Sequence, residues 1–532
     1  GESVGSDSPT LLLDAESGEL LIHFAELDPR AEDDARRALL IRPLERLDNS
    51  ARYIVAIRGL RDRQGALIAA PDGFRRIRDQ EASSDPVLGP LAERYEAGIF
   101  PELEAKGVPR DELQLAWDFT TESAEHVTRD MLHMREDLIA RLKEAPPAVT
   151  VTDVVDDVDV RIFRHIEATM RVPLYVTSDE PGAVLTRDEA GDVNSTSYAE
   201  VPFSIRIPRS LEHWTPDQPR ARVLQFGHGF FDSRGEADSG WLNELADRYR
   251  FVVVAADWWG MSVFDLESLI GAITAEPSTI MDFADRLHQG MANYIALTYA
   301  LAGPLQQVAE LQVEGSALYD PEQIYFYGCS QGGILGGTYV PLAPRIERAL
   351  LSVGGASFTF MMSRSRNFRA FMMLMQASVP DPLDLQKWIA LLSTSFDRID
   401  PVTYAPHAIR DLYPDSPAER WVLMHNGIGD ANVNDLAGHL LARTIGVAHL
   451  QPAPRSIMGL SPVVAPYEGS AIVEADFGIE PPLPGTWADP PFSENEVHGG
   501  VRRLQTGMQQ IDAFLKPGGP IEHFCDGVCD PE

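Results

Sequence analysis

Residues 323–337 read Gln-Ile-Tyr-Phe-Tyr-Gly-Cys-Ser-Gln-Gly-Gly-Ile-Leu-Gly-Gly, and this stretch decides the fold. Apolar and aromatic residues typical of a strand end at Gly328, Ser330 stands at the bend, and a helix of small residues begins at Gln331. A Gly-x-Ser-x-Gly motif between a strand and a helix is typical of a nucleophile elbow, a strained turn that exposes the serine. Gly328 and Gly332 lack the Cβ atoms that would collide with the adjoining strand and helix. The alternative is a glycine-rich helix start with an incidental serine, and partner residues in the right order decide between the two.

Strand and helix patterns alternate around this motif, as a mostly parallel sheet covered by helices requires. The predicted strands are residues 223–226, 251–256, 323–327, 349–353, 421–425 and 471–477. The helices predicted between them include residues 240–248, 280–299, 331–340 and 434–445. We therefore predict the α/β class for this part of the chain.

A serine nucleophile needs a base that takes its proton and an acid that orients the base. In a sheet of this kind the acid and then the histidine follow the serine along the chain. Asp430 lies in a turn after the strand 421–425, at the edge where open α/β sheets collect functional groups. His498 is the only histidine between the next strand and His523. We predict a triad of Ser330, Asp430 and His498, against the alternative that His498 is a surface-loop histidine.

Other aspartates are weaker candidates for the acid. Asp435 lies on the helix that follows Asp430. Asp400 begins an Asp-Pro turn before the strand 421–425, which places it at the wrong strand.

The oxyanion of acyl transfer needs two backbone N–H donors. The first is expected from Gln331, directly after the nucleophile, and the second from Phe230 in the loop Gly-His-Gly-Phe-Phe at residues 227–231. His228 in this loop is predicted to brace it by hydrogen bonds rather than to act as a second base.

Trp258 and Trp259 follow the strand 251–256 at the same edge of the sheet. Together with His228 they are the candidates for the substrate-binding side chains. Each tryptophan either lines an acyl or alcohol pocket or packs in the core, and the sequence does not separate the two.

The composition is acidic, with 80 Asp and Glu against 45 Lys and Arg and a formal net charge of -35. Such a surface repels phosphate backbones, so we expect no nucleic-acid partner. No apolar run approaches the roughly 18 residues of a transmembrane helix. The first residues, Gly-Glu-Ser-Val-Gly-Ser-Asp-Ser, contain neither a basic nor an apolar segment, so we expect no signal peptide, and a chain whose leader was removed would look the same.

The chain has 3 cysteines. Cys525 and Cys529 enclose a short loop that a disulfide could close in an oxidising compartment, and the alternative is a pair of free thiols. Two sulfurs with only His523 nearby are too few for a tetrahedral metal site, so no metal is expected. Cys329, which precedes the nucleophile, is interpreted as a small buried filler.

The residues before Pro146-Pro147 are predicted to form a separate domain, 10–147. Short apolar runs broken by turn residues between Leu11 and Ala70 indicate a small β-sandwich. Appended to it are helices at residues 87–106 and 123–142 and a strand at residues 113–119.

Residues 148–520 are predicted to form the second domain, which begins with antiparallel strands between residues 149 and 207. Residues 358–395 interrupt its alternating pattern and are rich in methionine and aromatic residues. Because methionine adapts to irregular surfaces, this segment is a possible cap over the site, and helical core packing is the alternative.

Residues 197–515 resemble the α/β-hydrolase superfamily of serine esterases and lipases. The elbow around Ser330, the Gly-His-Gly loop, the Gly-Asp-x-x-Val turn at residues 429–433 and the late His498 all match. The resemblance implies an α/β-hydrolase fold, a mostly parallel sheet covered by helices, with an N-terminal β-rich domain.

The N-terminal part resembles the same region of bacterial lipases of the virulence-factor type. The matching stretches are Tyr-Ile-Val-Ala-Ile-Arg-Gly-Leu-Arg-Asp from Tyr53 and Leu-Ala-Trp-Asp-Phe-Thr-Thr from Leu115. This resemblance implies an exported bacterial enzyme, secreted or held at the cell surface as a lipoprotein.

We therefore expect a carboxylic-ester hydrolase that acts on a small-molecule, lipid or polyester ester through an acyl-enzyme, without a metal or an organic cofactor. One alternative is a serine peptidase with the same triad. The other is a surface-binding module whose hydrolase domain is vestigial.

Overall fold

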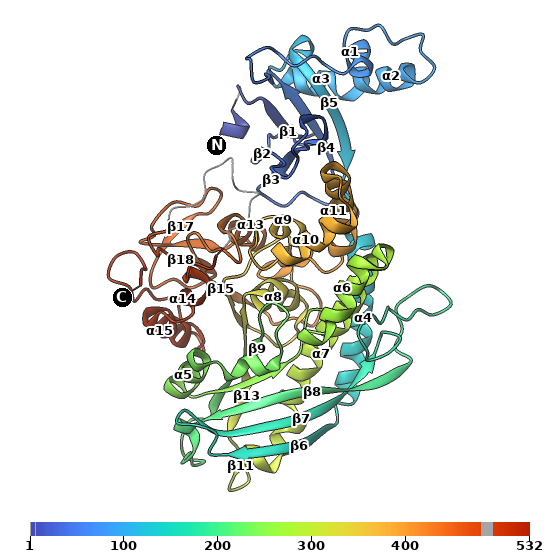
Figure 1. Cartoon of the computed structure of the whole chain (residues 1–532). Helices are drawn as coiled ribbons and strands as arrows, with labels where there is room; N and C mark the ends of the chain where they lie inside the picture. The colour runs from blue at the N-terminus through green and yellow to red at the C-terminus, as the bar shows by residue number, and fades with distance from the viewer. Residues whose placement is uncertain (1, 6, 480–492, 532) are drawn as a thin grey trace. The chain divides into compact units, whose positions relative to one another are not determined.

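The structure, a computed structural model, describes residues 2–5, 7–479 and 493–531 (Figure 1). The chain divides into two compact units. The first comprises residues 1–28 and 37–127, and the second comprises residues 29–36 and 128–532. The chain therefore crosses between the units three times, at residues 28/29, 36/37 and 127/128. The Pro-rich loop predicted before His498 falls on residues 480–492, outside the described residues.

The first unit is built on a three-stranded antiparallel sheet in the order β1-β4-β5. On the central strand, Ile54 and Ala56 pack against the helices α1 to α3, whereas Tyr53 and Val55 point to the opposite face. Helices pack on one face of this sheet, and Ile41 of the small sheet β2-β3 packs on the other. The predicted β-rich character of the N-terminal part is confirmed, and the β-sandwich stays a prediction. Its elements are β1 (Thr10–Asp14), β2 (His23–Leu27), β3 (Leu39–Pro43), β4 (Arg52–Arg58), α1 (Asp72–Arg78), α2 (Leu88–Gly98), α3 (Phe100–Ala105) and β5 (Leu113–Thr120).

Helix α4 (Ala124–Glu144) belongs with the second unit from Thr128 onward. Within it, Arg135 donates from Nε to the carbonyl oxygen of Leu342 at 2.7 Å and from Nη2 to that of Pro414 at 2.7 Å. The boundary predicted at Pro146-Pro147 is therefore corrected to the end of Val127, because the buried face of this helix packs on the second unit.

The second unit contains an eleven-stranded sheet in the order β17-β16-β18-β15-β14-β13-β9-β10-β8-β7-β6. From β17 to β10 neighbouring strands are parallel, and from β10 to β6 they are antiparallel. Figure 1 shows β6, β7 and β8 as long neighbouring strands. The strands are β6 (Val149–Asp156), β7 (Ile162–Leu174), β8 (Ser197–Pro208), β9 (Ala221–Gly227), β10 (Phe251–Ala256), β13 (Tyr319–Cys329), β14 (Arg348–Ser352), β15 (Trp421–Gly427), β16 (Ala448–Gln451), β17 (Pro462–Val464) and β18 (Ala471–Ala475).

Helices cover both faces of this sheet, so the parallel strands are buried, as in β10, where every residue is buried. Successive side chains along a strand point to opposite faces of the sheet, so each residue can be assigned to one face. Leu224 and Phe226 point toward α5, α14 and α15, whereas Gln225 between them bonds to Tyr294 of α7 and Tyr339 of α8. These helices are α5 (Gly240–Tyr249), α7 (Phe283–Ala302), α8 (Gln331–Leu342), α14 (Val497–Val501) and α15 (Gln505–Phe514).

The segment between β14 and β15 is helical. It contains α9 (Phe358–Met362), α10 (Arg369–Ser378), α11 (Pro382–Phe396) and α12 (Pro401–Tyr404). Its role as a cap stays a prediction. The segment 29–36 contacts it within the same unit, because Arg36 donates from Nη2 to Asp381 Oδ1 at 2.6 Å, directly before α11.

Cys525 and Cys529 form a disulfide, which decides between the two alternatives that the sequence left open. His523 lies beside it, but a disulfide offers no thiolate, so these three residues do not make a metal site. Among the described residues, no helix combines the length and the apolar character that crossing a membrane requires. The secreted location implied by the resemblance stays a prediction.

Candidate active site

Ser330 stands at the bend between β13 and α8 with φ 58° and ψ -121°. A non-glycine residue in such a conformation stores about 1–3 kcal/mol of backbone strain. The bend brings backbones very close together. A Cβ on Gly328 would lie 2.0 Å from the carbonyl oxygen of Gly332, and one on Gly332 would lie 2.0 Å from that of Gly227. Glycine is therefore required at both positions, because any Cβ would collide with the neighbouring backbone. This is the close approach that a nucleophile elbow predicts.

Asp430 and His498 are brought together from segments 68 residues apart. His498 Nδ1 lies 2.6 Å from Asp430 Oδ2, and both side chains are buried. The other carboxylate oxygen, Oδ1, accepts the backbone N–H groups of Asn432 at 2.8 Å and Val433 at 3.1 Å. The carboxylate is thus held in place and fixes the proton of His498 on Nδ1, which leaves Nε2 as a proton acceptor.

The other two aspartates have different partners. Asp435 accepts the backbone N–H of Gly429 at 2.9 Å and pairs with Arg455 at 2.8 Å. Asp400 accepts the backbone N–H of Phe358 at 2.7 Å, and burial raises its pKa to about 6. Neither residue bonds to His498, so the geometry favours Asp430.

Ser330 Oγ makes no hydrogen bond within the described residues, to His498 or to any other group. The two residues nevertheless belong to adjoining segments, because Arg502, next to the helix of His498, donates to Cys329 Sγ at 3.1 Å. In unliganded enzymes the bond between nucleophile and base is often long and shortens only when substrate binds.

The loop after β9 supplies the second predicted oxyanion donor. In the part of the chain that the structure describes, the backbone N–H groups of Phe230 and Gln331 donate no hydrogen bond, and their role as oxyanion donors stays a prediction. The Gln331 side chain ties this loop to the elbow: Oε1 accepts the N–H of Phe231 at 3.1 Å, and Nε2 donates to the carbonyl oxygen of Met261 at 2.7 Å.

His228 braces this loop. The N–H of Trp258 donates to His228 Nε2 at 2.8 Å, and His228 Nδ1 lies 3.0 Å from the carbonyl oxygen of Gly229. Burial lowers the pKa of His228, so the ring is neutral and donates from Nδ1. A fully buried ring with both nitrogens bonded contacts no substrate, so the bracing interpretation replaces that of a substrate-binding residue.

Trp258 and Trp259 pack in the core. Trp258 has no exposed surface and stacks on Tyr294 with ring centroids 3.6 Å apart. Trp259 is 7% exposed, and the guanidinium of Arg286 lies 4.3 Å from the centroid of its ring. Their placement as pocket residues is therefore corrected to core packing, because both rings are buried and each packs against another side chain.

An ion pair near the elbow was not predicted from the sequence. Glu236 Oε2 accepts the N–H of Gly229, which precedes Phe230, at 2.5 Å. Arg502 donates from Nη1 to Glu236 Oε1 at 3.2 Å. The two residues are 266 positions apart, and no local motif marks either one.

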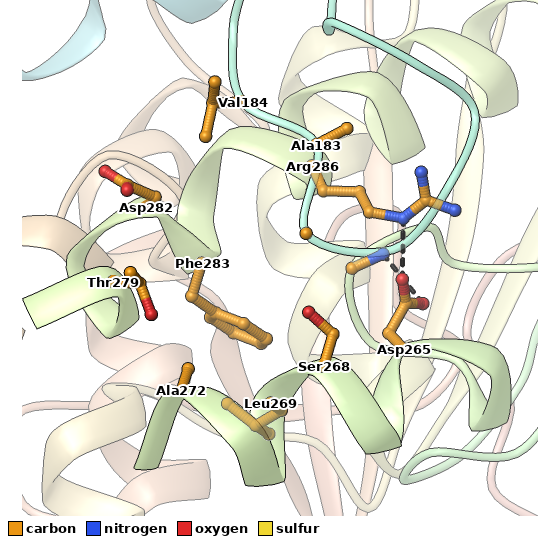
Figure 2. A pocket seen from close by; sticks show the side chains of 12 residues that line it. Ala183, Val184, Asp265, Ser268, Leu269, Ala272, Thr279, Asp282, Phe283 and Arg286 are labelled. Atoms are coloured by element: carbon orange, nitrogen blue, oxygen red, sulfur yellow. Dashed lines mark hydrogen bonds and ion pairs between the residues drawn. The ribbon is translucent and has the colours of Figure 1, made fainter. Parts of the chain in front are cut away.

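A pocket of about 390 Å³ opens beside α6 (Leu266–Thr274) and the start of α7 (Figure 2). A buried pair forms one side, with Arg286 Nε 2.6 Å from Asp265 Oδ1. Figure 2 shows Phe283 and Leu269 close together at another side. We call this space the outer pocket.

A scan of known protein families finds no model that matches the chain, and no curated protein matches it. Solved structures resemble it at low identity. Acetyl Xylan Esterase 1 from Thermoanaerobacterium sp. JW/SL YS485 is 14% identical with a TM-score of 0.39, over 67% of this chain and 90% of that one. An acetyl xylan esterase from Paenibacillus sp. R4 is 15% identical with a TM-score of 0.38, over 65% and 87%. A puromycin-hydrolyzing peptidase of Mycobacterium tuberculosis is 14% identical with a TM-score of 0.34, over 69% and 47%.

The fold follows from the topology of the sheet. The strand order β8-β10-β9-β13-β14-β15-β18, with β8 antiparallel to its neighbours, carries a serine at the bend after β13 and an Asp-His pair after β15 and β18. The predicted fold class is confirmed: the second unit has the α/β-hydrolase fold.

Proposed function

We propose that the chain hydrolyses carboxylic esters through a covalent acyl-enzyme. Ser330 is the nucleophile, His498 is the general base and then the general acid, and Asp430 fixes the tautomer of the imidazole. The backbone N–H groups of Phe230 and Gln331 stabilise the oxyanion.

In the first half-reaction Ser330 Oγ attacks the acyl carbon, and its proton passes to His498 Nε2. The carbonyl electrons move onto the oxygen and return when the bond to the alcohol oxygen breaks. The alcohol leaves with the proton from Nε2. A water then attacks the acyl-enzyme, gives its proton to Nε2 and releases the carboxylic acid, while Ser330 Oγ takes the proton back.

The observation that carries this proposal is the bond of 2.6 Å between His498 Nδ1 and Asp430 Oδ2. A buried carboxylate that bonds to one imidazole nitrogen orients the ring and stabilises the imidazolium that forms during attack. Ser330, whose backbone is strained, lies on an adjoining segment. Its Oγ is the proposed nucleophile, and His498 Nε2 is the nitrogen that would take its proton.

Matched ester and amide substrates test the reaction class. We expect turnover of p-nitrophenyl butyrate and no detectable turnover of butyryl p-nitroanilide, together with covalent labelling by a fluorophosphonate. Mass spectrometry of the labelled protein should place the adduct on Ser330.

Two other outcomes would overturn the proposal in different ways. Anilide or peptide cleavage as efficient as ester cleavage would establish the serine peptidase alternative. A folded protein that neither reacts with the fluorophosphonate nor hydrolyses either substrate would favour the surface-binding module.

A further inference from the structure

A small apolar cavity lies between the helical segment 358–396, the segment 269–283 and the loops after β9 and β10. Its volume is about 30 Å³, and each residue that lines it is Phe, Met, Leu or Ile. With no polar partner on its walls, such a cavity does not hold an ordered water, because a buried water needs two to four hydrogen bonds. It therefore suits an apolar ligand group.

This apolar cavity adjoins the proposed nucleophile through Gln331. Phe231 and Met261 both line the cavity, and the Gln331 side chain bonds to the backbone of each. Gln331 directly follows Ser330, and Phe231 directly follows the predicted oxyanion donor Phe230. Gln331 therefore links two residues of the cavity wall to the bend that carries the proposed nucleophile.

The apolar cavity and the outer pocket share two walls. Leu269 and Phe283 line both spaces and are half-buried. Phe283 also packs against Phe396 of α11, with ring centroids 5.7 Å apart. The outer pocket, with a volume of about 390 Å³, lies on the far side of Leu269 and Phe283 (Figure 2).

We propose that the apolar cavity binds the acyl group of the ester, and that Leu269 and Phe283 limit its length by separating the cavity from the outer pocket. This proposal rests on the proposed ester hydrolysis. A cavity of about 30 Å³ has room for about two or three non-hydrogen atoms. The preferred substrates are therefore esters of short, unbranched, apolar acids.

A series of p-nitrophenyl esters from acetate to octanoate, in buffer without detergent, tests the separating role. We expect kcat/KM of the native protein to fall beyond butyrate. In Leu269→Ala and Phe283→Ala the ratio of octanoate to acetate kcat/KM should rise about ten-fold or more, because the outer pocket becomes part of the acyl site. If the alanine variants do not fold, Leu269→Val and Phe283→Leu replace them in the test. We expect a smaller rise in the ratio of octanoate to acetate kcat/KM for these variants.

Ser268→Ala is the matched control, because Ser268 lines only the outer pocket. Its ratio should equal that of the native protein. An unchanged ratio in folded Leu269 and Phe283 variants that still hydrolyse acetate would overturn the acyl-site proposal alone. A native protein inactive on the whole series would instead overturn the proposed function.

A second inference comes from the ion pair of Glu236 and Arg502. It joins three segments of the proposed site: Glu236 holds the N–H of Gly229, and Arg502 bonds to both Glu236 and Cys329. Each side chain of the pair is 16% exposed, so water screens the pair little. Burial raises the pKa of Cys329 to about 12, so its sulfur accepts the bond as a neutral thiol.

We infer that Glu236 and Arg502 are positioning residues that hold the oxyanion loop against the elbow. An oxyanion donor acts on the transition state far more than on the bound substrate. Loosening the loop should therefore lower kcat and leave KM nearly unchanged.

Arg502→Met and Glu236→Gln test this inference in the full chain. We expect kcat for p-nitrophenyl butyrate to fall about ten- to hundred-fold with KM changed by less than about two-fold. Arg502→Lys, which keeps the charge, should recover part of kcat and serves if Arg502→Met does not fold. The exposed neighbour Arg503 gives the control Arg503→Met, with native kcat. Native kcat in folded Arg502→Met, or a loss confined to KM, would overturn the positioning role.

Discussion

Ser330→Ala should lower kcat for p-nitrophenyl butyrate by about 10⁵-fold or more, because removal of the nucleophile of a triad leaves only the contribution of the oxyanion site and of binding. The fold should survive, since alanine is smaller than serine and Ser330 Oγ bonds to no described residue. Initial rates with titrated enzyme, together with a thermal melt, measure both expectations.

Ser210→Ala is the control for Ser330→Ala, because it makes the same chemical change at an exposed serine. It should keep native kcat. A folded Ser330→Ala variant with turnover near that of the native protein would remove Ser330 from the mechanism and with it the proposed function.

Asp430→Asn should lower kcat by about 10³- to 10⁴-fold. An asparagine can still accept the N–H groups of Asn432 and Val433, so the loop should keep its shape. Its amide group, however, donates to His498 Nδ1 and moves the imidazole proton to Nε2, where it blocks attack by Ser330. The pH profile of kcat/KM and a crystal structure of the variant distinguish this cause from a displaced loop.

Asp435→Asn tests whether the acid of the triad is Asp430 or Asp435. Its side-chain oxygen can still accept the N–H of Gly429, while the charge that pairs with Arg455 is lost. We expect less than about a ten-fold loss of kcat, because Asp435 does not touch His498. A larger loss in Asp435→Asn than in Asp430→Asn would show that the acid had been assigned to the wrong residue.

The central sheet could be predicted because buried parallel strands are short, continuous apolar runs. The run at residues 251–256 is β10 without any change of boundary. The edge strand β17 and its neighbour β16 were missed, because Pro462–Val464 and Ala448–Gln451 are short and only partly buried. Helix α1 was missed in the same way, since its seven residues contain only two buried side chains, Phe74 and Ile77.

Contacts between side chains that are far apart in the chain are the hardest feature to predict from the sequence. Asp430 and His498 could be predicted because chain order in this fold restricts where an acid and a base can come from. Nothing comparable restricts Glu236 and Arg502, which are ordinary charged residues 266 positions apart. The sequence around Trp258 does not show whether its ring faces a ligand or stacks on Tyr294, because Tyr294 comes from a distant part of the chain, helix α7.

The assignment of residues 29–36 to the second unit has a practical consequence for protein production. A gene fragment that starts at residue 128 omits eight residues of the unit it is meant to encode. Among them is Arg36, whose guanidinium pairs with Asp381 at the start of α11. To express the second unit by itself, this octapeptide would have to be supplied by a redesigned connection or as a separate peptide.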